Sequence, residues 1–449
     1  MEQNKATLLA LDSLSIYRGL LEDQVLSKLK ALLHCLNSGG PAAVQLSKVV
    51  NGYNEFFFAL AKSGMTSLTQ YILDLLIFDE NPFSFACQRG EETGCQSILD
   101  KAVSQDLANL QRVAGLNVSV FKAEIAELFS SEIDKLVIIA LPEWTAGYQP
   151  LCCPEHIQDI KAHFYRAEDW VQCLDELKTF YQNYGCGVFA RYYAFVWEKT
   201  TGQGYLKGID KPDPISLEQL VDYQYERNRV IENTLQFLNG FPANNVLLYG
   251  DRGTGKSSTV KGILNRYHSQ GLRMIEIPKA YLADFPLIIR QLKNRSQKFI
   301  IFVDDLVFGD NEENYTSLKA VLEGGLESKT PNILIYATSN RRHLVKEYFS
   351  ERAGLQSGNH DEEVHARDSM QEKLSLADRF GINVVFSSPD QNQYLAIVKG
   401  IAEARNLNAD WELLRKEALQ WALWYNGRSA RTAKQFVDWF EGHVSLGNQ

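Results

Sequence analysis

A glycine-rich segment that follows an apolar run is the part of this sequence with the clearest potential for chemistry. Val246–Tyr249 is followed by Gly250, Asp251, Arg252, Gly253, Thr254, Gly255, Lys256, Ser257 and Ser258, which fit the pattern G-x-x-x-x-G-K-[ST]. Glycines let the backbone turn its N–H groups towards phosphate oxygens, and the start of a following helix adds a favourable dipole. We expect Lys256 to meet the β- and γ-phosphates of a nucleotide and the Ser257 hydroxyl to ligate Mg²⁺.

Two consecutive acids follow a second apolar run. Phe299–Val303 predicts a strand buried on both faces, and Asp304 and Asp305 come directly after it. An acid at the end of a strand beside a phosphate loop can hold Mg²⁺ directly or through water, and we assign this role to Asp304. Asp305 is placed to orient the attacking water, and its short side chain predicts slow turnover. A purely structural acid is the alternative for Asp305.

Three further polar residues occur in an order that suits hydrolysis. Asn340 follows the predicted strand Ile333–Thr338, where its side chain can hydrogen-bond the attacking water. Arg379 precedes another predicted strand, and an arginine there can reach the γ-phosphate of a neighbouring subunit. Arg431 lies at the start of a C-terminal helix and can fold back onto the phosphates, with Arg428 as the alternative. For each arginine, a surface ion pair is the competing interpretation.

The elements that must position these residues alternate between short β-rich runs and amphipathic helices. Strands are predicted at Asn245–Tyr249, Met274–Ile277, Phe299–Val303, Ile333–Thr338 and Ile382–Phe386. Strands separated by helical segments indicate crossover connections and a parallel sheet. The sequence therefore predicts a five-stranded parallel α/β core over residues 215–388, followed by a helical lid over 389–449.

The first part of the chain has a different character. Residues 1–210 have a net charge of −8 and residues 211–449 a net charge of −1, and all 7 cysteines lie between Cys35 and Cys186. Apolar residues recur at helical spacing in stretches such as Val49–Leu60 and Leu68–Phe78. We predict a mainly helical N-terminal domain over 1–200 without catalytic residues, and a glycine- and proline-rich linker over 201–214.

Composition limits the compartment and the partners. The N-terminus does not resemble a signal peptide, and no apolar stretch reaches the roughly 20 residues that span a bilayer. An odd number of irregularly spaced cysteines indicates free thiols and a cytoplasmic protein, although Cys152, Cys153 and His156 leave a zinc site as a weaker alternative. The net charge of −9 does not favour nucleic acid as a partner.

The order of these motifs resembles that of the AAA+ ATPases, over about residues 215–445. More closely, the sequence is similar to the bacterial family known as "domain of unknown function 815". The similarity rests on Asn81–Ser84, Leu248–Ser258, Asp304–Leu306, Ala337–Leu344, Glu372–Gly381 and Gly427–Ser429. The resemblance implies ATP and Mg²⁺ binding and assembly of identical subunits into a ring or spiral, such as a hexamer, with ATP between subunits. Asp305 departs from the superfamily, in which glutamate is commoner at this position.

Two weaker features and three functions stay open at this point. Tyr281 follows the second predicted strand, where threading ATPases carry a pore loop, although a helix start is favoured. The polar stretch Gly354–Lys373 predicts a solvated insertion.

The leading function is an ATPase that changes the conformation of an unknown protein client. The alternatives are a nucleotide-gated scaffold with little turnover and a protein similar to DNA helicase loaders.

Overall fold

The structure is a computed structural model in which two compact units follow one another along the chain, Met1–Arg191 and Tyr192–Gln449. It describes residues 2–37, 45–89, 96–145, 153–200, 202–306, 318–319, 322, 330–340, 379–407, 409–425 and 427–447. Cys152 and the stretch Gly354–Lys373 lie outside the described residues. Among the described helices, none is both long and apolar enough to cross a membrane.

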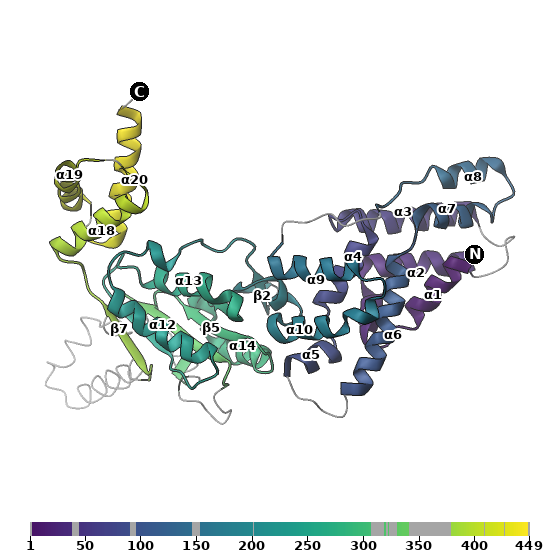
Figure 1. Ribbon diagram of the computed structural model, residues 1–449, viewed down its shortest axis with the longest axis horizontal. Helices are drawn as coiled ribbons and strands as arrows, with labels where there is room; N and C mark the ends of the chain where they lie inside the picture. Colours follow the sequence, from purple (N-terminus) through teal and green to yellow (C-terminus); the bar gives the residue numbers. More distant parts are fainter. Residues whose placement is uncertain are drawn as a thin grey trace. The chain divides into compact units, whose positions relative to one another are not determined.

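The N-terminal unit is helical, as predicted, and Figure 1 shows its helices packed side by side. Its longer helices are α1 (Glu2–Asp12), α2 (Gln24–Asn37), α3 (Leu46–Lys62), α4 (Leu68–Phe78), α5 (Pro82–Arg89), α6 (Gln96–Ala114), α7 (Val118–Ala126), α8 (Glu132–Ile139), α9 (Glu155–Arg166) and α10 (Leu174–Tyr184). The short helix α11 (Val188–Arg191) ends the unit. Helix α4 has the predicted bounds, because Ser67 caps its first turn and Asn81-Pro82 follows its end.

Buried polar groups fix the turns between these helices. The carboxylate of Asp106, a fully buried residue of α6, accepts hydrogen bonds from the backbone N–H groups of Ser15, Ile16 and Tyr17. The Tyr17 and Tyr181 hydroxyls lie 3.1 Å apart, and that of Tyr181 donates to a backbone carbonyl of α4. A buried charge and buried hydroxyls are tolerated here because each has a partner.

The second unit contains a seven-stranded sheet in the order β2-β1-β4-β5-β6-β3-β7. The strands are β1 (Ala194–Thr200), β2 (Gln203–Gly208), β3 (Val246–Gly250), β4 (Leu272–Glu276), β5 (Lys298–Val303), β6 (Ile333–Ser339) and β7 (Ile382–Phe386). Among the strands that the described residues form, β2 pairs antiparallel with β1 and the other pairings are parallel. Helices α12 (Gln224–Leu238), α13 (Lys256–Tyr267) and α14 (Phe285–Leu292) cover the sheet (Figure 1).

The five predicted strands are confirmed as β3 to β7, but the sequence did not reveal the other two. Strand β2 lies inside the predicted linker 201–214, so that prediction was wrong for its first part. The glycines that suggested flexibility have packing roles. A Cβ atom on Gly204 would lie 2.1 Å from the Trp197 ring, and one on Gly208 would lie 2.1 Å from the Tyr192 ring. Glycine is needed at both positions because aromatic rings cover the backbone.

Three helices follow the sheet: α18 (Gln391–Ala404), α19 (Trp411–Trp424) and α20 (Ala430–Gly447). Asp390 caps α18 in a reciprocal arrangement with Gln393, and Asp410 caps α19. Apolar residues of these helices, such as Tyr394 and Phe436, belong to the same buried cluster as strand residues of the sheet. The predicted C-terminal helical part is therefore confirmed as helices that share a core with the sheet.

Candidate functional site

The site lies where three neighbouring parallel strands end. Strand β3 leads into the phosphate loop, β5 into Asp304 and Asp305, and β6 into Asn340. In the register of the sheet, Tyr249 of β3 pairs with Ser339, and Val303 of β5 pairs with Ala337. The side chains that follow these strands therefore meet at one edge of the sheet, as the carboxyl ends of parallel strands do in ligand-binding α/β proteins.

The loop from Gly250 to Lys256 has the backbone shape that its glycines permit. Gly250, Gly253 and Gly255 have φ values of 130°, 75° and 93°, which residues with a Cβ rarely adopt. A Cβ on Gly250 would also lie 2.1 Å from the Phe386 carbonyl oxygen of β7. The Thr254 hydroxyl donates to the Asp251 carbonyl within the loop at 2.9 Å. Helix α13 begins at Lys256, so the N–H groups of its first turn follow directly on the loop.

Lys256 lies folded against this loop. Its Nζ donates to the carbonyl oxygens of Gly250 and Asp251 at 3.1 and 2.6 Å. The pKa of Lys256 is lowered to about 8, mainly by burial and in smaller part by the charge of Arg431, while the nearby carboxylates of Asp251, Asp304 and Asp305 act in the opposite direction. An ammonium that donates to carbonyl oxygens in a buried position can exchange them for phosphate oxygens, which carry a stronger negative charge.

Ser257 and Asp304 meet in a set of oxygen atoms that suits Mg²⁺. The Ser257 hydroxyl donates to Asp304 Oδ1 at 2.5 Å, and the hydroxyl of Thr338 on β6 donates to the same oxygen at 2.5 Å. Mg²⁺ prefers hard oxygen ligands, and it usually takes one or two carboxylates together with waters and phosphates. A serine hydroxyl and a carboxylate, converging next to a phosphate loop, fit that preference.

Asp305 has both carboxylate oxygens engaged. Its Oδ1 accepts a hydrogen bond from Asn340 Nδ2 at 2.6 Å, and its Oδ2 forms an ion pair with Lys279 Nζ at 3.0 Å. Its backbone is left-handed, with φ of 52°, and its N–H donates to the Thr338 hydroxyl at 2.8 Å. The structure thus brings together Asp304, Asp305 and Asn340, with the Thr338 hydroxyl as the bridge between the two acids.

The phosphate loop is also held from two other elements. The Asp251 carboxylate accepts hydrogen bonds from the backbone N–H and the hydroxyl of Ser388, both at 2.8 Å, so it ties the loop to the end of β7. On the lid side, the Arg431 N–H donates to the Gly253 carbonyl at 3.0 Å. A Cβ on Gly253 would lie 2.9 Å from the Ser429 hydroxyl. The start of α20 therefore contacts the loop directly.

The two candidate lid arginines occupy different places. Arg431 is the second residue of α20 and its N–H contacts the phosphate loop, whereas Arg428 Nη2 donates to the side chain of Gln391 on α18 at 3.1 Å. Arg431 is thus the one whose backbone meets the loop and whose charge affects Lys256. Its predicted contact with phosphates stays a prediction.

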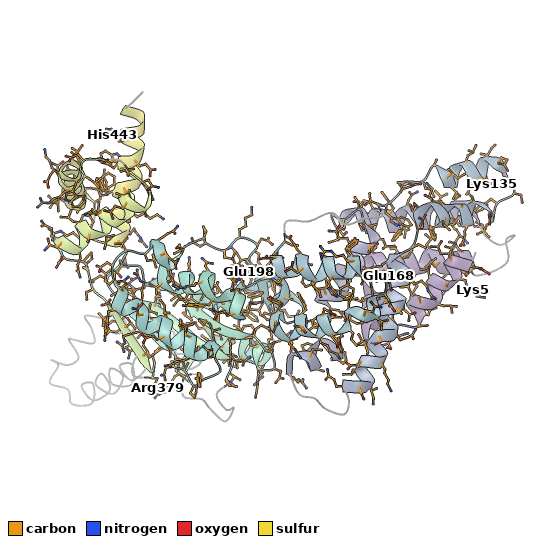
Figure 2. The ribbon with its side chains drawn as sticks, in the orientation of Figure 1. Lys5, Lys135, Glu168, Glu198, Arg379 and His443 are labelled. Carbon is orange, nitrogen blue, oxygen red and sulfur yellow. The ribbon has the colours of Figure 1, made fainter. Side chains whose placement is uncertain are left out.

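Arg379 lies away from the site of its own chain. It comes three residues before β7, and the register pairs Ile382 with Val246 at the opposite end of the strands from the phosphate loop (Figure 2 labels Arg379 near the beginning of β7). A five-residue strand is about 17 Å long. Arg379 therefore lies near the ends of the strands opposite its own phosphate loop, and its predicted role requires a second subunit.

The sequence reasoning did not find four residues that complete the site: Thr338, Lys279, Ser388 and Ser429. Thr338 had a detectable signal, because it ends the predicted strand one residue before Ser339-Asn340. Lys279 had none, since its proximity to Asp305 follows only from the pairing of β4 with β5.

A model of the protein family described as "Protein of unknown function (DUF815)" matches residues 190–444. The chain belongs to the DUF815 family. Among curated proteins, the DUF815 chain is 29% identical over 140 residues to the proteasome-activating nucleotidase of Methanosarcina mazei, which covers 28% of this chain and 32% of that protein. It is 36% identical over 70 residues to the 26S proteasome regulatory subunit 4 homolog of Schizosaccharomyces pombe, which covers 14% of this chain and 16% of that protein.

The DUF815 chain therefore spans a third or less of the length of these curated relatives. Among solved structures, a mutant of RuvB from Thermotoga maritima has a TM-score of 0.37 and 13% identity, covering 52% of this chain and 67% of that one. The Thermotoga maritima RuvB Holliday junction branch migration motor has a TM-score of 0.31 and 12% identity, covering 50% and 72%. Together with the family match, the curated relatives confirm the predicted relationship to AAA+ ATPases.

Proposed function

We propose that this DUF815 protein binds ATP with Mg²⁺ and hydrolyses the ATP, using the resulting change of shape to act on a protein client. The observation that carries the proposal is the convergence of Lys256, Ser257 and Asp304 on the phosphate loop. A cationic side chain, a hydroxyl and a carboxylate at a helix N-terminus are the groups that a Mg²⁺-bound triphosphate requires.

In this proposal, each residue has one task. The loop N–H groups and Lys256 bind the phosphates, and Ser257 and Asp304 hold Mg²⁺, which neutralises charge on the β- and γ-phosphates when bound. Asp305 and Asn340, which are hydrogen-bonded to each other, orient the attacking water. Arg431 at the start of α20 couples the lid to the phosphates, since its backbone already contacts the phosphate loop.

The proposal includes assembly of several identical subunits. Arg379 lies at the edge of the sheet away from its own phosphate loop, so it can complete a site only on a neighbouring copy. In other nucleoside triphosphatases an arginine supplied in this way accelerates hydrolysis about 10³–10⁵-fold. Both curated relatives have the proteasome in their names, which supports a protein client over nucleic acid, as does the net charge of −9.

Binding of ATP to the full chain tests the first step. Lys256→Ala removes a charged hydrogen-bond donor, and we expect a loss of ATP affinity of about 10- to 150-fold, measured by calorimetry. Lys261→Ala is the matched control, because Lys261 lies on the same helix but forms an ion pair with Asp213. Equal affinities for the two variants, or an absence of ATP binding by the wild type, would contradict the proposal.

A second candidate, a nucleotide-gated scaffold with little turnover, is favoured by the state of Asp305. Both of its carboxylate oxygens are engaged, one of them with the positive charge of Lys279. Release of phosphate, measured at protein concentrations where oligomers form, separates the two candidates. Tight ATP binding without phosphate release supports the scaffold, whereas sustained release supports the ATPase.

A further inference from the structure

We propose that the β1–β2 hairpin controls the hydrolytic site, by holding the segment that pairs Lys279 with Asp305. This inference rests on the proposed ATPase function and adds its regulation. The connecting segment is the 3₁₀ segment η6 (Lys279–Asp284), which follows β4 and leads into α14. Its first residue contacts the site, and its last residue contacts the hairpin.

The contact with the hairpin is made by a buried charge. Asp284 is 6% exposed, and its Oδ2 accepts a hydrogen bond from the indole Nε1 of Trp197 at 2.8 Å. The same oxygen forms an ion pair with Lys199 Nζ, also at 2.8 Å. Both partners lie on β1, and the Lys199 ammonium is 5.4 Å from the centre of the Tyr281 ring. A buried carboxylate depends on such partners, so η6 is fixed to the hairpin.

The contact with the site is made at the other end of the same segment. Lys279 Nζ lies 3.0 Å from Asp305 Oδ2, opposite the hydrogen bond that Asn340 donates to Oδ1. Pro278 fixes the backbone before Lys279, and its carbonyl accepts the Tyr281 N–H at 2.9 Å. A displacement of Asp284 is therefore transmitted over six residues to the ion pair at Asp305. Because Lys279 competes with water for Asp305 Oδ2, the pair restrains hydrolysis.

The hairpin is also where the two units of the chain are joined. Arg191, the last residue of the N-terminal unit, forms an ion pair with Asp74 at 3.4 Å, and its guanidinium lies 4.3 Å from the Phe78 ring. The next residue, Tyr192, covers Gly208 of β2. Arg191 and Tyr192 are consecutive residues, and each packs within its own unit.

ATP turnover of full-length variants tests this coupling. Lys199→Met removes the charge that holds Asp284 and keeps the side-chain length. We expect kcat at saturating ATP to rise about 1.5- to 5-fold, the range for a partly exposed ion pair, with KM for ATP unchanged. Lys279→Ala should give the same rise, and the double variant no further rise, because both changes free Asp305 from Lys279, one directly and the other by releasing Asp284 at the far end of η6. Lys207→Met is the control, since Lys207 pairs with Glu198 on the hairpin itself.

Hydrogen exchange provides a readout that does not depend on turnover. In Lys199→Met, amides of residues 279–284 and 303–306 should exchange faster than in Lys207→Met. A Lys199→Met variant that matches Lys207→Met in both measurements would overturn the inference, as would rises in kcat that multiply in the double variant. Failure of the proposed function would look different. The wild type would neither bind nor hydrolyse ATP, yet Lys199→Met would still speed hydrogen exchange at residues 303–306.

Discussion

The hydroxyl of Thr338 forms hydrogen bonds with both acids of the site, Asp304 and Asp305. Thr338 is 2% exposed, its hydroxyl donates to Asp304 Oδ1, and it accepts the N–H of Asp305. Thr338→Val replaces the hydroxyl with a methyl group of similar size. It removes a hydrogen bond to a charged group, worth about 1.5–3 kcal/mol, and leaves the Asp305 N–H without this acceptor, at a cost of about 1–3 kcal/mol.

Allowing for relaxation, we expect Thr338→Val to destabilise the C-terminal unit by about 3 kcal/mol. For a unit of this size the loss corresponds to a fall in melting temperature of roughly 6–12 °C. Thr338→Ser is the control, since it keeps the hydroxyl and loses only a methyl group, for about 1 kcal/mol. The two variants are compared by calorimetry of the full chain and by hydrogen exchange at the Asp305 and Leu306 amides.

The expected result is a lower melting temperature for the valine variant than for the serine variant, together with faster exchange at Asp305. Mg²⁺ should also bind more weakly with ATP in the valine variant, because Asp304 loses one of the two hydroxyls that orient it. Equal melting temperatures and equal exchange in the two variants would refute the bridging role of the hydroxyl. A defect in the serine variant as large as that in the valine variant would assign the effect to packing instead.

Three further predictions follow from the same geometry. Burial lowers the pKa of Lys256 to about 8, and only the protonated amine attracts phosphate. ATP affinity measured by calorimetry should therefore fall about tenfold between pH 7 and pH 9. In Lys256→Arg, whose side chain stays charged, the affinity should not change with pH over this range. Gly250→Ala should lower the melting temperature more than Gly271→Ala, because both have positive φ but only at Gly250 would a Cβ meet a backbone atom, the Phe386 carbonyl oxygen. Arg379→Ala should abolish most hydrolysis without weakening ATP binding, and mixing it with a Lys256→Ala chain should restore phosphate release if Arg379 acts on a neighbouring subunit.

Local signals in the sequence were enough to predict the five strands β3 to β7 and the phosphate loop. Short apolar runs such as Phe299–Val303 are typical of buried strands. The glycines of the loop adopt positive φ values that glycine favours over other residues. The hairpin could not be predicted in this way. Gly204 and Gly208 suggested a linker, but their role depends on rings at Trp197 and Tyr192, and no local pattern shows which ring covers which glycine.

The contacts of Asp305 show the same limit at the site itself. Asn340 could be predicted as its neighbour, because both follow apolar strands and the ends of parallel strands meet. Lys279 could not, since its position depends on β4 being next to β5 in the sheet order. Arg428 and Arg431 are three residues apart, and their separation became clear only from the partners that each one contacts, Gln391 and the phosphate loop.

The backbone of Asp305 gives a physical reason for aspartate at a position where glutamate is commoner in the superfamily. Asp304 must reach the Ser257 hydroxyl, and successive side chains of a strand point to opposite faces. A left-handed residue directly after Asp304 redirects the chain, and Asp305 has φ of 52°. Asparagine and aspartate adopt this conformation far more readily than residues with longer side chains, for which it costs roughly 1–2 kcal/mol. The shorter acid is therefore consistent with the turn that brings its carboxylate to Asn340 and Lys279.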